Sequence, residues 1–501
     1  MRIVHFWLVG VLVAAAVVSV QCGCRSNSTD SQSSQSGRLQ PSTSVAPGPA
    51  PESMAPLALP LNFKRHLGDL DGMRKRHVIR VLVVPSRSGF FYDRGIPHGI
   101  FYEAFNEFQR FANQKLKTGA VKITVGFIPV RPEQLERALL DGVGDIVGYG
   151  VVVTPEREKV ALFTTPIATN VKQVIVTGPK AAPVNTLEDL SGKEVFVNPL
   201  TVYYENLQRL SQEFQKAGRA PILVKAADPN LTDEDLLEMV NAGLIPATVT
   251  LSARAEFWSQ VLPRLTLHPN VVLKEEGQLA FVTRKDSPQL RQLLDEFVQG
   301  RQIGTSFGNT LLRRYLQNTK WVKDATSTEE MKKFQEYVRY FQKYAAEYDF
   351  DYLMLVAQGY QESLLDQSKK NPSGALGIMQ VIPKYAAAAP ISIPNVDKAE
   401  NNIEAGAKML RHIAETYFND DKLDATNKTL MVFAAYNAGP SRIVRLRKKA
   451  ASEGLNPNQW FGNVELVTAK DVGQETVQYV SNIYKYYVAY KLTLEEAGSP
   501  K

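Results

Sequence analysis

The spacing of apolar residues changes near residue 328, and this change limits the fold more than any other feature of the sequence. Before it, short β-branched runs such as 78–84 and 121–128 alternate with helical stretches such as 100–115 and 133–141. This alternation predicts α/β units with largely parallel sheets. Further strand-like runs follow at 145–153, 171–177, 193–198, 222–227 and 247–251, and two more helical stretches end near Leu316.

No strand-like run remains after residue 328. The segments there have helical spacing; in one of them Ile403, Ala407, Leu410, Ala414 and Tyr417 fall on one face. The predicted helices are 328–348, 351–363, 403–418, 427–437 and 472–494. We therefore expect a multidomain chain in which an α/β region precedes an all-α domain.

The first residues predict a secretory signal peptide over 1–24, because Arg2 precedes an apolar run from about residue 3 to 20. Cys22 and Cys24 are the only cysteines, and a disulfide between them would close a very small loop. One of them is more plausible as the lipid-modified residue of a bacterial lipoprotein. Gly23 favours Cys24 over Cys22, and a plain signal peptide or an uncleaved anchor helix stays open.

Residues 25–72 begin with a stretch rich in Ser, Gln and Pro, which predicts a flexible tether. No later stretch is apolar for long enough to cross a bilayer. We therefore expect a protein that works outside the cytoplasm and is tethered at one end.

Composition excludes several functional classes. Hydrophobic residues make up 44% of the 501 residues, enough for sizeable cores, and the formal net charge is +7. No stripe of Arg and Lys indicates nucleic-acid binding. The six histidines are scattered without ligand spacing, so no metal site is expected.

A single carboxylate stands out in the helical half. Leu353, Val356, Ala357 and Tyr360 form the buried face of a helix, and Glu362 follows near its end. Apolar neighbours and a Gly-rich loop predict a raised pKa, which a general acid needs at neutral pH. An exposed helix-end glutamate is the alternative.

Two further motifs accompany Glu362. The turn 371–374 leads into a segment that ends with Met379 and Gln380, and residues 434–440 read AAYNAGP. The second motif is a usual helix stop. It brings Tyr436 and Asn437 to one helix end, in a place to line a cleft.

Together and in this order, QES, NPSGALGIMQ, AAYNAG and ETVQYVSNIYKYY resemble the catalytic domain of the lytic transglycosylases of the soluble-lytic-transglycosylase type. The domain order resembles that of the F-type membrane-bound lytic transglycosylases. The resemblance implies a two-lobed α/β domain like periplasmic binding proteins at 73–320, and an all-α, lysozyme-like domain at 328–495. The implied activity is cleavage of the MurNAc-GlcNAc β-1,4 bond of peptidoglycan, without a cofactor.

The resemblance implies that Glu362 is the single acid and base. The muramic acid C6 hydroxyl attacks C1 and leaves a 1,6-anhydromuramyl end, so no second carboxylate is needed, and Asp366 is expected to be a loop or capping residue. Ordinary glycosidases use two carboxylates. Two alternatives stay open: a hydrolytic muramidase on the same scaffold, and a non-catalytic cell-wall solute sensor.

The other carry-overs concern the sugar groove. Met379 and Gln380 match loop residues that line it, and Tyr436 matches the tyrosine that positions the reacting sugar. Tyr479 matches an aromatic residue facing the groove, with a core tyrosine as the alternative. Asn371 stands where most members carry a serine that contacts substrate, and it keeps hydrogen-bonding capacity.

The N-terminal half resembles the periplasmic solute-binding proteins for amino acids. Arg157 falls on the arginine that pairs with a ligand carboxylate, although Glu156 and Glu158 also offer it surface ion pairs. Thr250 or Leu251 stands where an aspartate would bind the ligand ammonium. We therefore expect a cell-wall peptide or muropeptide as ligand, or a role in regulating or positioning the catalytic domain.

The implied location is the bacterial cell envelope, at the periplasmic face of the outer membrane, reached through a lipid anchor. The expected partners are peptidoglycan glycan strands and the membrane, and no nucleic acid is expected.

Overall fold

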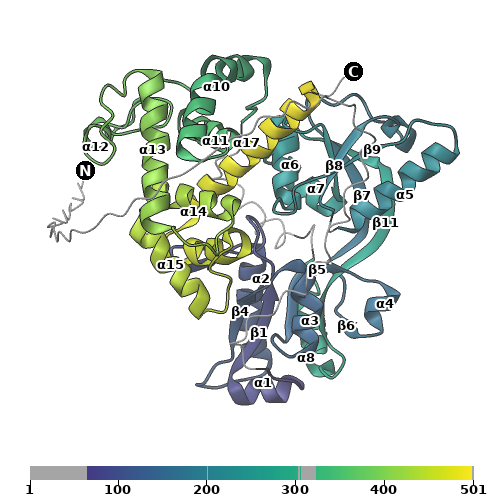
Figure 1. The fold of residues 1–501 in the computed structure, drawn as a ribbon. Coiled ribbons are helices and arrows are strands. Elements are labelled where there is room, and N and C mark those ends of the chain that lie inside the picture. Colours follow the sequence, from purple (N-terminus) through teal and green to yellow (C-terminus); the bar gives the residue numbers. More distant parts are fainter. Residues whose placement is uncertain (1–64, 200, 303–304, 306–322, 499–501) are drawn as a thin grey trace, which may run out of the picture. The chain divides into compact units, whose positions relative to one another are not determined.

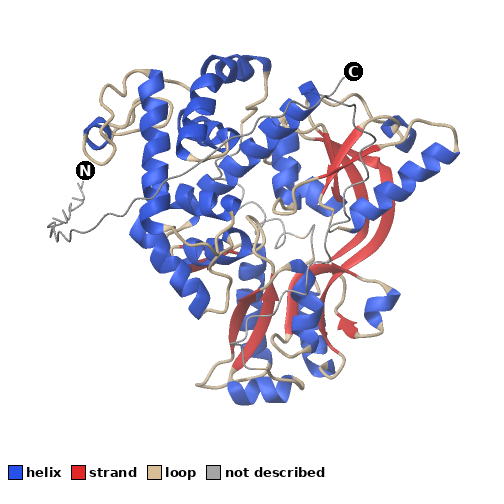
Figure 2. Cartoon of the chain, viewed as in Figure 1, coloured by secondary structure: helices blue, strands red, loops and turns tan. Residues whose placement is uncertain are grey.

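The computed structural model describes residues 65–199, 201–302, 305 and 323–498. The expected signal peptide, both cysteines, most of the tether and the helical stretch ending near Leu316 lie outside these ranges. The strands belong to the first part of the chain, and the part from α10 onward is helical (Figures 1 and 2). The fold class is therefore an α/β region followed by an all-α region.

One sheet of the described residues joins nine strands in the order β4-β1-β5-β11-β7-β10-β8-β9, with β6 paired to β11. β2 and β3 form a separate hairpin. The strands are β1 Val78–Val83, β2 Phe91–Asp93, β3 Ile96–His98, β4 Thr124–Pro129, β5 Ile146–Val152, β6 Ala161–Phe163, β7 Ala168–Thr177, β8 Glu194–Val197, β9 Leu223–Ala226, β10 Ala247–Leu251 and β11 Thr266–Arg284.

The prediction of largely parallel sheets is wrong for the middle of this sheet. β1 is parallel to β4 and β5, and β8 is parallel to β9 and β10. Between these two parallel sets, β7 and β11 are antiparallel to each other and to their other neighbours. The reason is that β11 pairs with β7 along most of its length and with β5 and β6 through its last residues. It therefore connects one parallel set to the other.

Each parallel set forms a lobe with its helices. We call β1, β4, β5 and β6 the first lobe, and β8, β9 and β10 the second lobe. Strand β10 is buried along its whole length, as expected for a strand covered on both faces. The helices of this half are α1 Leu70–Arg76, α2 Ile100–Lys115, α3 Leu135–Leu140, α4 Pro155–Glu158, α5 Val202–Lys216, α6 Asp233–Ala242, α7 Ser252–Ser259 and α8 Pro288–Val298, with 3-10 turns Pro132–Gln134 and Leu187–Leu190.

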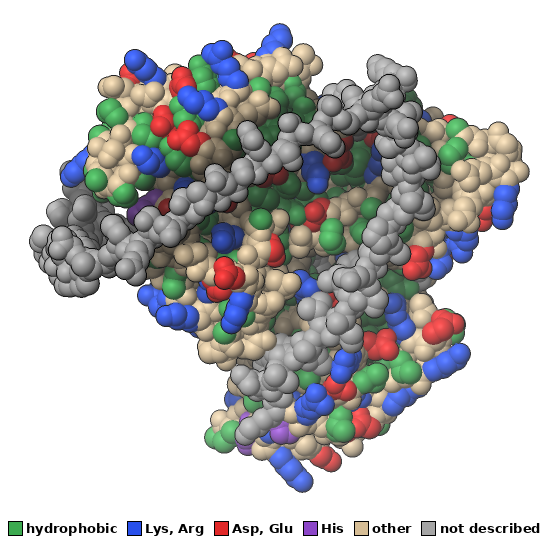
Figure 3. All heavy atoms as spheres, viewed as in Figure 1, with side chains coloured by type: hydrophobic (Ala, Val, Ile, Leu, Met, Phe, Trp, Pro, Cys, Tyr) green, Lys and Arg blue, Asp and Glu red, His purple; other side chains and the backbone are tan. Residues whose placement is uncertain are grey.

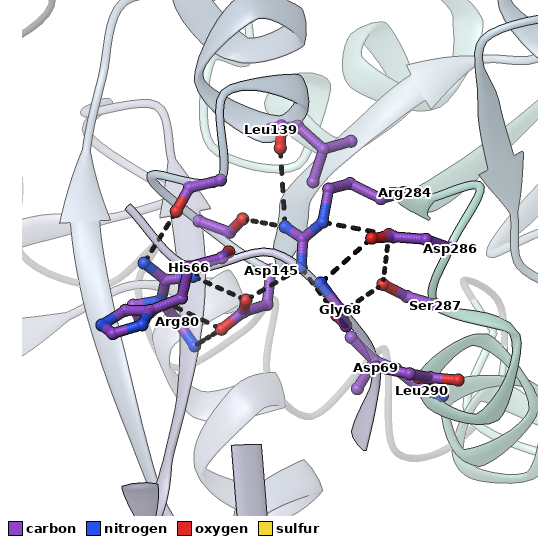
Figure 4. A network of polar contacts seen from close by, with 12 residues as sticks. His66, Gly68, Asp69, Arg80, Leu139, Asp145, Arg284, Asp286, Ser287 and Leu290 are labelled. Carbon is purple, nitrogen blue, oxygen red and sulfur yellow. Dashed lines mark hydrogen bonds and ion pairs between the residues drawn. The ribbon is translucent and has the colours of Figure 1, made fainter. Parts of the chain in front are cut away.

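A buried carboxylate holds the first lobe together (Figure 4). Asp145 is 0% exposed and forms ion pairs with Arg76, Arg80 and Arg284 at 2.5, 2.7 and 3.2 Å. Burial alone would raise the pKa of Asp145, but the hydrogen bonds and charge of Arg80, and the charge of Arg76, hold it below the usual range. Arg284 also donates to the Gly68 carbonyl, so the last residue of β11 and the segment before α1 are joined here.

The helical region consists of α10 Thr328–Tyr348, α11 Tyr352–Ser363, α12 Pro383–Ala387, α13 Ala399–Tyr417, α14 Ala425–Ala438, α15 Pro440–Ser452, η3 Trp460–Val464, α16 Glu465–Asp471 and α17 Gln474–Gly498. Side-chain oxygens cap the starts of α10, α11 and α14: Ser327, Asp351 and Asp424 accept from backbone N–H groups of the first turn. α11 is the central helix, because residues 353–360 are all buried. The predicted helices of this region are confirmed.

Helix α17 also contacts the second lobe. Lys485 is 0% exposed, and its ammonium donates to Glu238 of α6 at 2.7 Å and pairs with Asp235 at 2.9 Å. Arg87, which follows β1, also pairs with Glu238. A buried cation of α17 is thus neutralised by two acids of α6.

On the face shown in Figure 3, basic and acidic side chains are interspersed, in keeping with the modest net charge.

Candidate active site

Glu362 lies one residue before the end of α11. The helix stops because Leu364 takes a left-handed conformation (φ 64°) and its N–H donates to the Tyr360 carbonyl. The preceding turns are fully buried, whereas the Glu362 side chain is half-buried. A core helix therefore carries a single carboxylate to the boundary between the interior and solvent.

Two buried polar side chains support this carboxylate. The Tyr479 hydroxyl donates to Glu362 Oε1 at 2.7 Å, and Gln358 Nε2 donates to the Tyr479 oxygen at 3.1 Å. Tyr479 belongs to α17 and is 7% exposed; Gln358 belongs to α11 and is 0% exposed. Both readings of Tyr479 therefore describe part of its setting, because it is buried among core residues and also bonded to Glu362.

Burial raises the pKa of Glu362 to about 7. The hydrogen bond from Tyr479 and the positive charge of Lys369 oppose this effect only in part. Lys369 also donates from Nζ to the Glu362 carbonyl at 2.8 Å. A carboxyl group with a pKa near neutral can give up a proton and take one back under the same conditions.

Asn371 organises the loop that follows. Its Oδ1 accepts from Ser373 N at 3.0 Å, Ser373 Oγ at 2.7 Å and Ala375 N at 3.0 Å. These bonds close an Asx turn, in which Gly374 takes φ 86°. The amide oxygen of Asn371 is therefore engaged by its own loop.

Met379 and Gln380 occupy the end of this loop. Met379 is fully buried; its N–H donates to Asn402 Oδ1 at 2.8 Å and its carbonyl accepts from the Tyr436 hydroxyl at 2.9 Å. Gln380 has φ 47°, and its Nε2 donates to the Gly377 carbonyl at 2.8 Å. The loop is thus tied to α13 through Asn402 and to α14 through Tyr436.

Tyr436 and Asn437 lie in the last turn of α14, close to the helix end that the motif predicts. Tyr436 is half-buried, and burial together with the charge of Glu362 raises the pKa of its hydroxyl. Asn437 is exposed, and its Oδ1 accepts from Thr476 of α17 at 2.7 Å. Glu362, Tyr479, Tyr436 and the Met379 carbonyl therefore lie in one connected site.

Arg157 is not part of this site. It is exposed on α4, and its Nη1 donates to the Val152 carbonyl at 3.0 Å. In the second lobe, Thr250 and Leu251 end β10 and are buried, so no acid stands there. Arg254, one turn further on, donates to the Tyr149 hydroxyl of the first lobe at 2.7 Å and pairs with an acid of α6.

Sequence reasoning missed Gln358, Lys369 and Asn402. Gln358 left a signal, because it is a polar residue inside an apolar helical run. Lys369 and Asn402 left none, because their contacts depend on how loops and helices meet.

Within the described ranges, no three His, Cys, Asp or Glu side chains are grouped so that they could hold a metal ion. In the same part of the chain, no helix has the length and apolar character needed to span a bilayer.

Each half of the chain matches a known protein family. Residues 80–305 match the family of bacterial extracellular solute-binding proteins, family 3, and residues 339–458 match the transglycosylase SLT domain. The second match contains Glu362, the loop at 371–380 and Tyr436, and ends before Tyr479.

Similar proteins align with most of the chain. The membrane-bound lytic murein transglycosylase F of Pseudomonas fluorescens is 25% identical over 442 residues, which cover 83% of this chain and 85% of that protein. The protein of the same name from Shewanella woodyi is 27% identical over 377 residues, which cover 71% of this chain and 74% of that protein. The solved structure of an ancestral arginine-binding protein bound to arginine covers 48% of this chain and 98% of its own, with 20% identity and a TM-score of 0.36.

The chain thus contains a family-3 solute-binding region followed by a transglycosylase SLT region, and over 83% of its length it is similar to a membrane-bound lytic murein transglycosylase F.

Proposed function

We propose that the helical region cleaves the MurNAc-GlcNAc β-1,4 bond of peptidoglycan without water and leaves 1,6-anhydromuramyl ends, in cell-wall turnover or remodelling. The observation that carries the proposal is the state of Glu362. It is a half-buried carboxyl group with a pKa of about 7, bonded to a buried tyrosine. Such a group can serve as acid and base in one turnover.

In the first step, protonated Glu362 donates its proton to the glycosidic oxygen, and the bond from that oxygen to C1 breaks. In the second step, the Glu362 carboxylate accepts the proton of the muramic acid C6 hydroxyl, and the C6 oxygen bonds to C1. Glu362 ends protonated, as it began, and no water is consumed. Tyr479 donates to the carboxylate between the two steps, when its negative charge is present.

The surroundings of Glu362 support a reaction with one carboxylate. Among the described residues, the groups that set its pKa are Tyr479 and Lys369, and no second acid contributes. Asp366, the next acid in the sequence, is exposed and accepts from Ser368 N and Oγ, as a loop residue does. An intramolecular nucleophile replaces the second acid, and good alignment of such a group is worth about 7–11 kcal/mol.

The loop and the end of α14 are the proposed substrate-binding residues. The Tyr436 hydroxyl donates to the Met379 carbonyl and lies close enough to Glu362 to be affected by its charge. Gln380 follows Met379 in the loop, and Asn437 follows Tyr436 in the last turn of α14. Asn371 acts by holding the loop in shape, so its replacement by serine is expected to keep activity if the turn survives.

Digestion of purified sacculi by the wild type and by Glu362→Gln tests the proposal, with products identified by mass. We expect anhydromuramyl products from the wild type and none from the variant. Reducing-end products from the wild type would establish a hydrolytic muramidase instead. Cleavage that survives Glu362→Gln would remove the mechanism, and no cleavage by the wild type would favour a sensor.

The proposed place of action is the periplasmic face of the outer membrane, reached through a lipid on Cys24, or else on Cys22. The matched relatives are named as membrane-bound. Fractionation of envelopes tests the anchor: Cys24→Ala is expected to release the protein into the soluble fraction, and retention by both single cysteine variants would refute lipidation.

For the N-terminal region we expect a peptide or muropeptide ligand in preference to a free amino acid. Thr250 and Leu251 cannot neutralise an ammonium group, and burying an unpaired charge is costly. Calorimetric titration with a purified muropeptide and with free amino acids distinguishes the two, and Arg157→Ala tests its part in holding a carboxylate.

A further inference from the structure

Gln358 has no place in the mechanism described so far, although it lies one helical turn before Glu362. Positions i and i+4 of a helix share a face, so both side chains leave α11 on the same side. The neighbouring buried residues of α11 are mainly apolar, and Gln358 is 0% exposed among them.

The direction of the hydrogen bond between Gln358 and Tyr479 is informative. A phenol has one proton. Because Gln358 Nε2 donates to the Tyr479 oxygen, the Tyr479 proton is directed to Glu362 Oε1. Hydrogen bonds in such a chain polarise one another, so the first bond strengthens the second.

Packing does not explain this glutamine. Its Oε1 is buried and has no hydrogen-bond partner within the described part of the chain. A buried polar atom without a partner reduces stability, and an apolar side chain of similar size would avoid that loss. Stability alone would therefore favour an apolar residue at position 358.

We propose that Gln358 is a positioning residue that orients the Tyr479 hydroxyl toward the Glu362 carboxylate and so sets the balance between its acid and base forms. This inference rests on the proposed role of Glu362. Among the residues that the structure describes, the ionisable groups facing Glu362 are Tyr479 from α17, Tyr436 from α14 and Lys369 from the loop after α11. Of these groups, only Tyr479 is bonded to Gln358.

The amide also suits the protonated state. A half-turn of its terminal group places Oε1 where Nε2 now lies, and the Tyr479 proton then points to Gln358. The Tyr479 oxygen is thereby open to accept from protonated Glu362. A methionine supports neither arrangement, and it weakens the ionised state more, because the bond from Tyr479 to the carboxylate is charge-assisted.

The test measures the titration of Glu362 in the full-length protein. The protonated carboxyl band is taken from infrared difference spectra between each variant and the same variant carrying Glu362→Gln. We expect Tyr479→Phe to raise the midpoint by about one pH unit or more, because a charge-assisted bond is lost. Gln358→Met is expected to raise it by about half a unit, because one bond of the chain is lost.

The double variant separates positioning from packing. If Gln358 acts through Tyr479, the midpoint of Gln358→Met/Tyr479→Phe equals that of Tyr479→Phe alone. An unchanged midpoint in Gln358→Met, or two shifts that add, overturns the inference. The alkaline limb of the pH profile of kcat/KM on glycan strands should move with the midpoint.

Two further variants act as controls. Gln358→Asn keeps a buried amide but is one methylene too short to reach Tyr479, so it should reproduce the shift if Gln358→Met does not fold. Gln173→Met replaces a glutamine of β7 that is equally buried and bonded to Asn206, and it should leave the midpoint unchanged. Reducing-end products from sacculi would refute the proposed lyase reaction but would leave these midpoints as they are, so the two failures are distinguishable.

Discussion

Replacing Glu362 by glutamine is expected to stabilise the helical region at neutral pH while it removes activity. The pKa of Glu362 rises from 4.5 to about 7 on folding, chiefly through burial. The folded state therefore holds this proton over a pH range in which the unfolded chain has lost it. The free energy of unfolding falls as the pH rises from about 4.5 to about 7, and it levels off above that.

The size of the effect follows from the same values. Each pH unit between the two pKa values corresponds to about 1.36 kcal/mol, which gives about 3 kcal/mol as the full cost of the charge. The carboxyl group is only half-buried, so solvent screening reduces this, and we expect about 2 kcal/mol. A neutral glutamine of the same shape avoids the cost, so the variant should gain about that amount above pH 7 and little below pH 4.5.

Hydrogen exchange of the α11 amides gives the local free energy of opening for both proteins at several pH values. The expected result is slower exchange in Glu362→Gln at pH 8 and nearly equal free energies at pH 4.5. Asp366→Asn is the control, because that exposed carboxylate has a lowered pKa and its loss should bring no gain at pH 8. A stabilisation of equal size at both pH values would refute the reasoning, because it would not arise from ionisation.

Three further changes have definite expected outcomes. Lys485→Met leaves Glu238 and Asp235 of α6 buried with less positive charge, so the free energy of unfolding, measured by thermal unfolding, should fall by about 3–5 kcal/mol. Lys485→Arg keeps the charge and should lose much less. Asp145→Asn leaves three arginines without their shared carboxylate and should lower the free energy of unfolding by about 3–5 kcal/mol at pH 7. Because the pKa of Asp145 is lowered in the folded state, this difference in free energy between variant and wild type should shrink as the pH falls below about 4. Gly377→Ala places a methyl group 2.6 Å from the Asn402 amide at φ 73°, so glycan cleavage should fall at least tenfold while circular dichroism stays helical.

Much of the site was predictable because its parts are local in sequence. Apolar spacing fixes α11 and brings Glu362 to its end, and the AAYNAGP motif ends α14 at Ala438, two residues after Tyr436. The same local logic misled at Pro440. The motif predicts only a helix stop there, but proline also suits the first turn of a helix, and Pro440 begins α15.

The sheet shows the limit of local reasoning more clearly. β11 runs for 19 residues through Pro269 and several charged positions, which ordinarily argue against a strand. Its pairing with β7 contains register shifts near His268 and Val272, and these bulges accommodate the irregular sequence. Only the long-range partner makes this segment a strand, so its own composition could not reveal it.

The bonds that tune Glu362 were beyond sequence reasoning for the same cause. Gln358 and Tyr479 are 121 positions apart, and their contact exists only because α17 packs against α11. Once that packing is known, the groups of the site can be compared by what each costs in stability. A carboxyl with a raised pKa and an amide oxygen without a partner both reduce stability, and they lie one turn apart on one helix. The helix tolerates them because Asp351 caps its start, the left-handed Leu364 closes its end, and Ser363 Oγ is bonded to the Gly359 and Ile378 carbonyls. The Glu362 carboxyl and the Gln358 amide both reduce stability and both contact Tyr479, which indicates that function shaped this site, because selection for stability alone would have removed each of them.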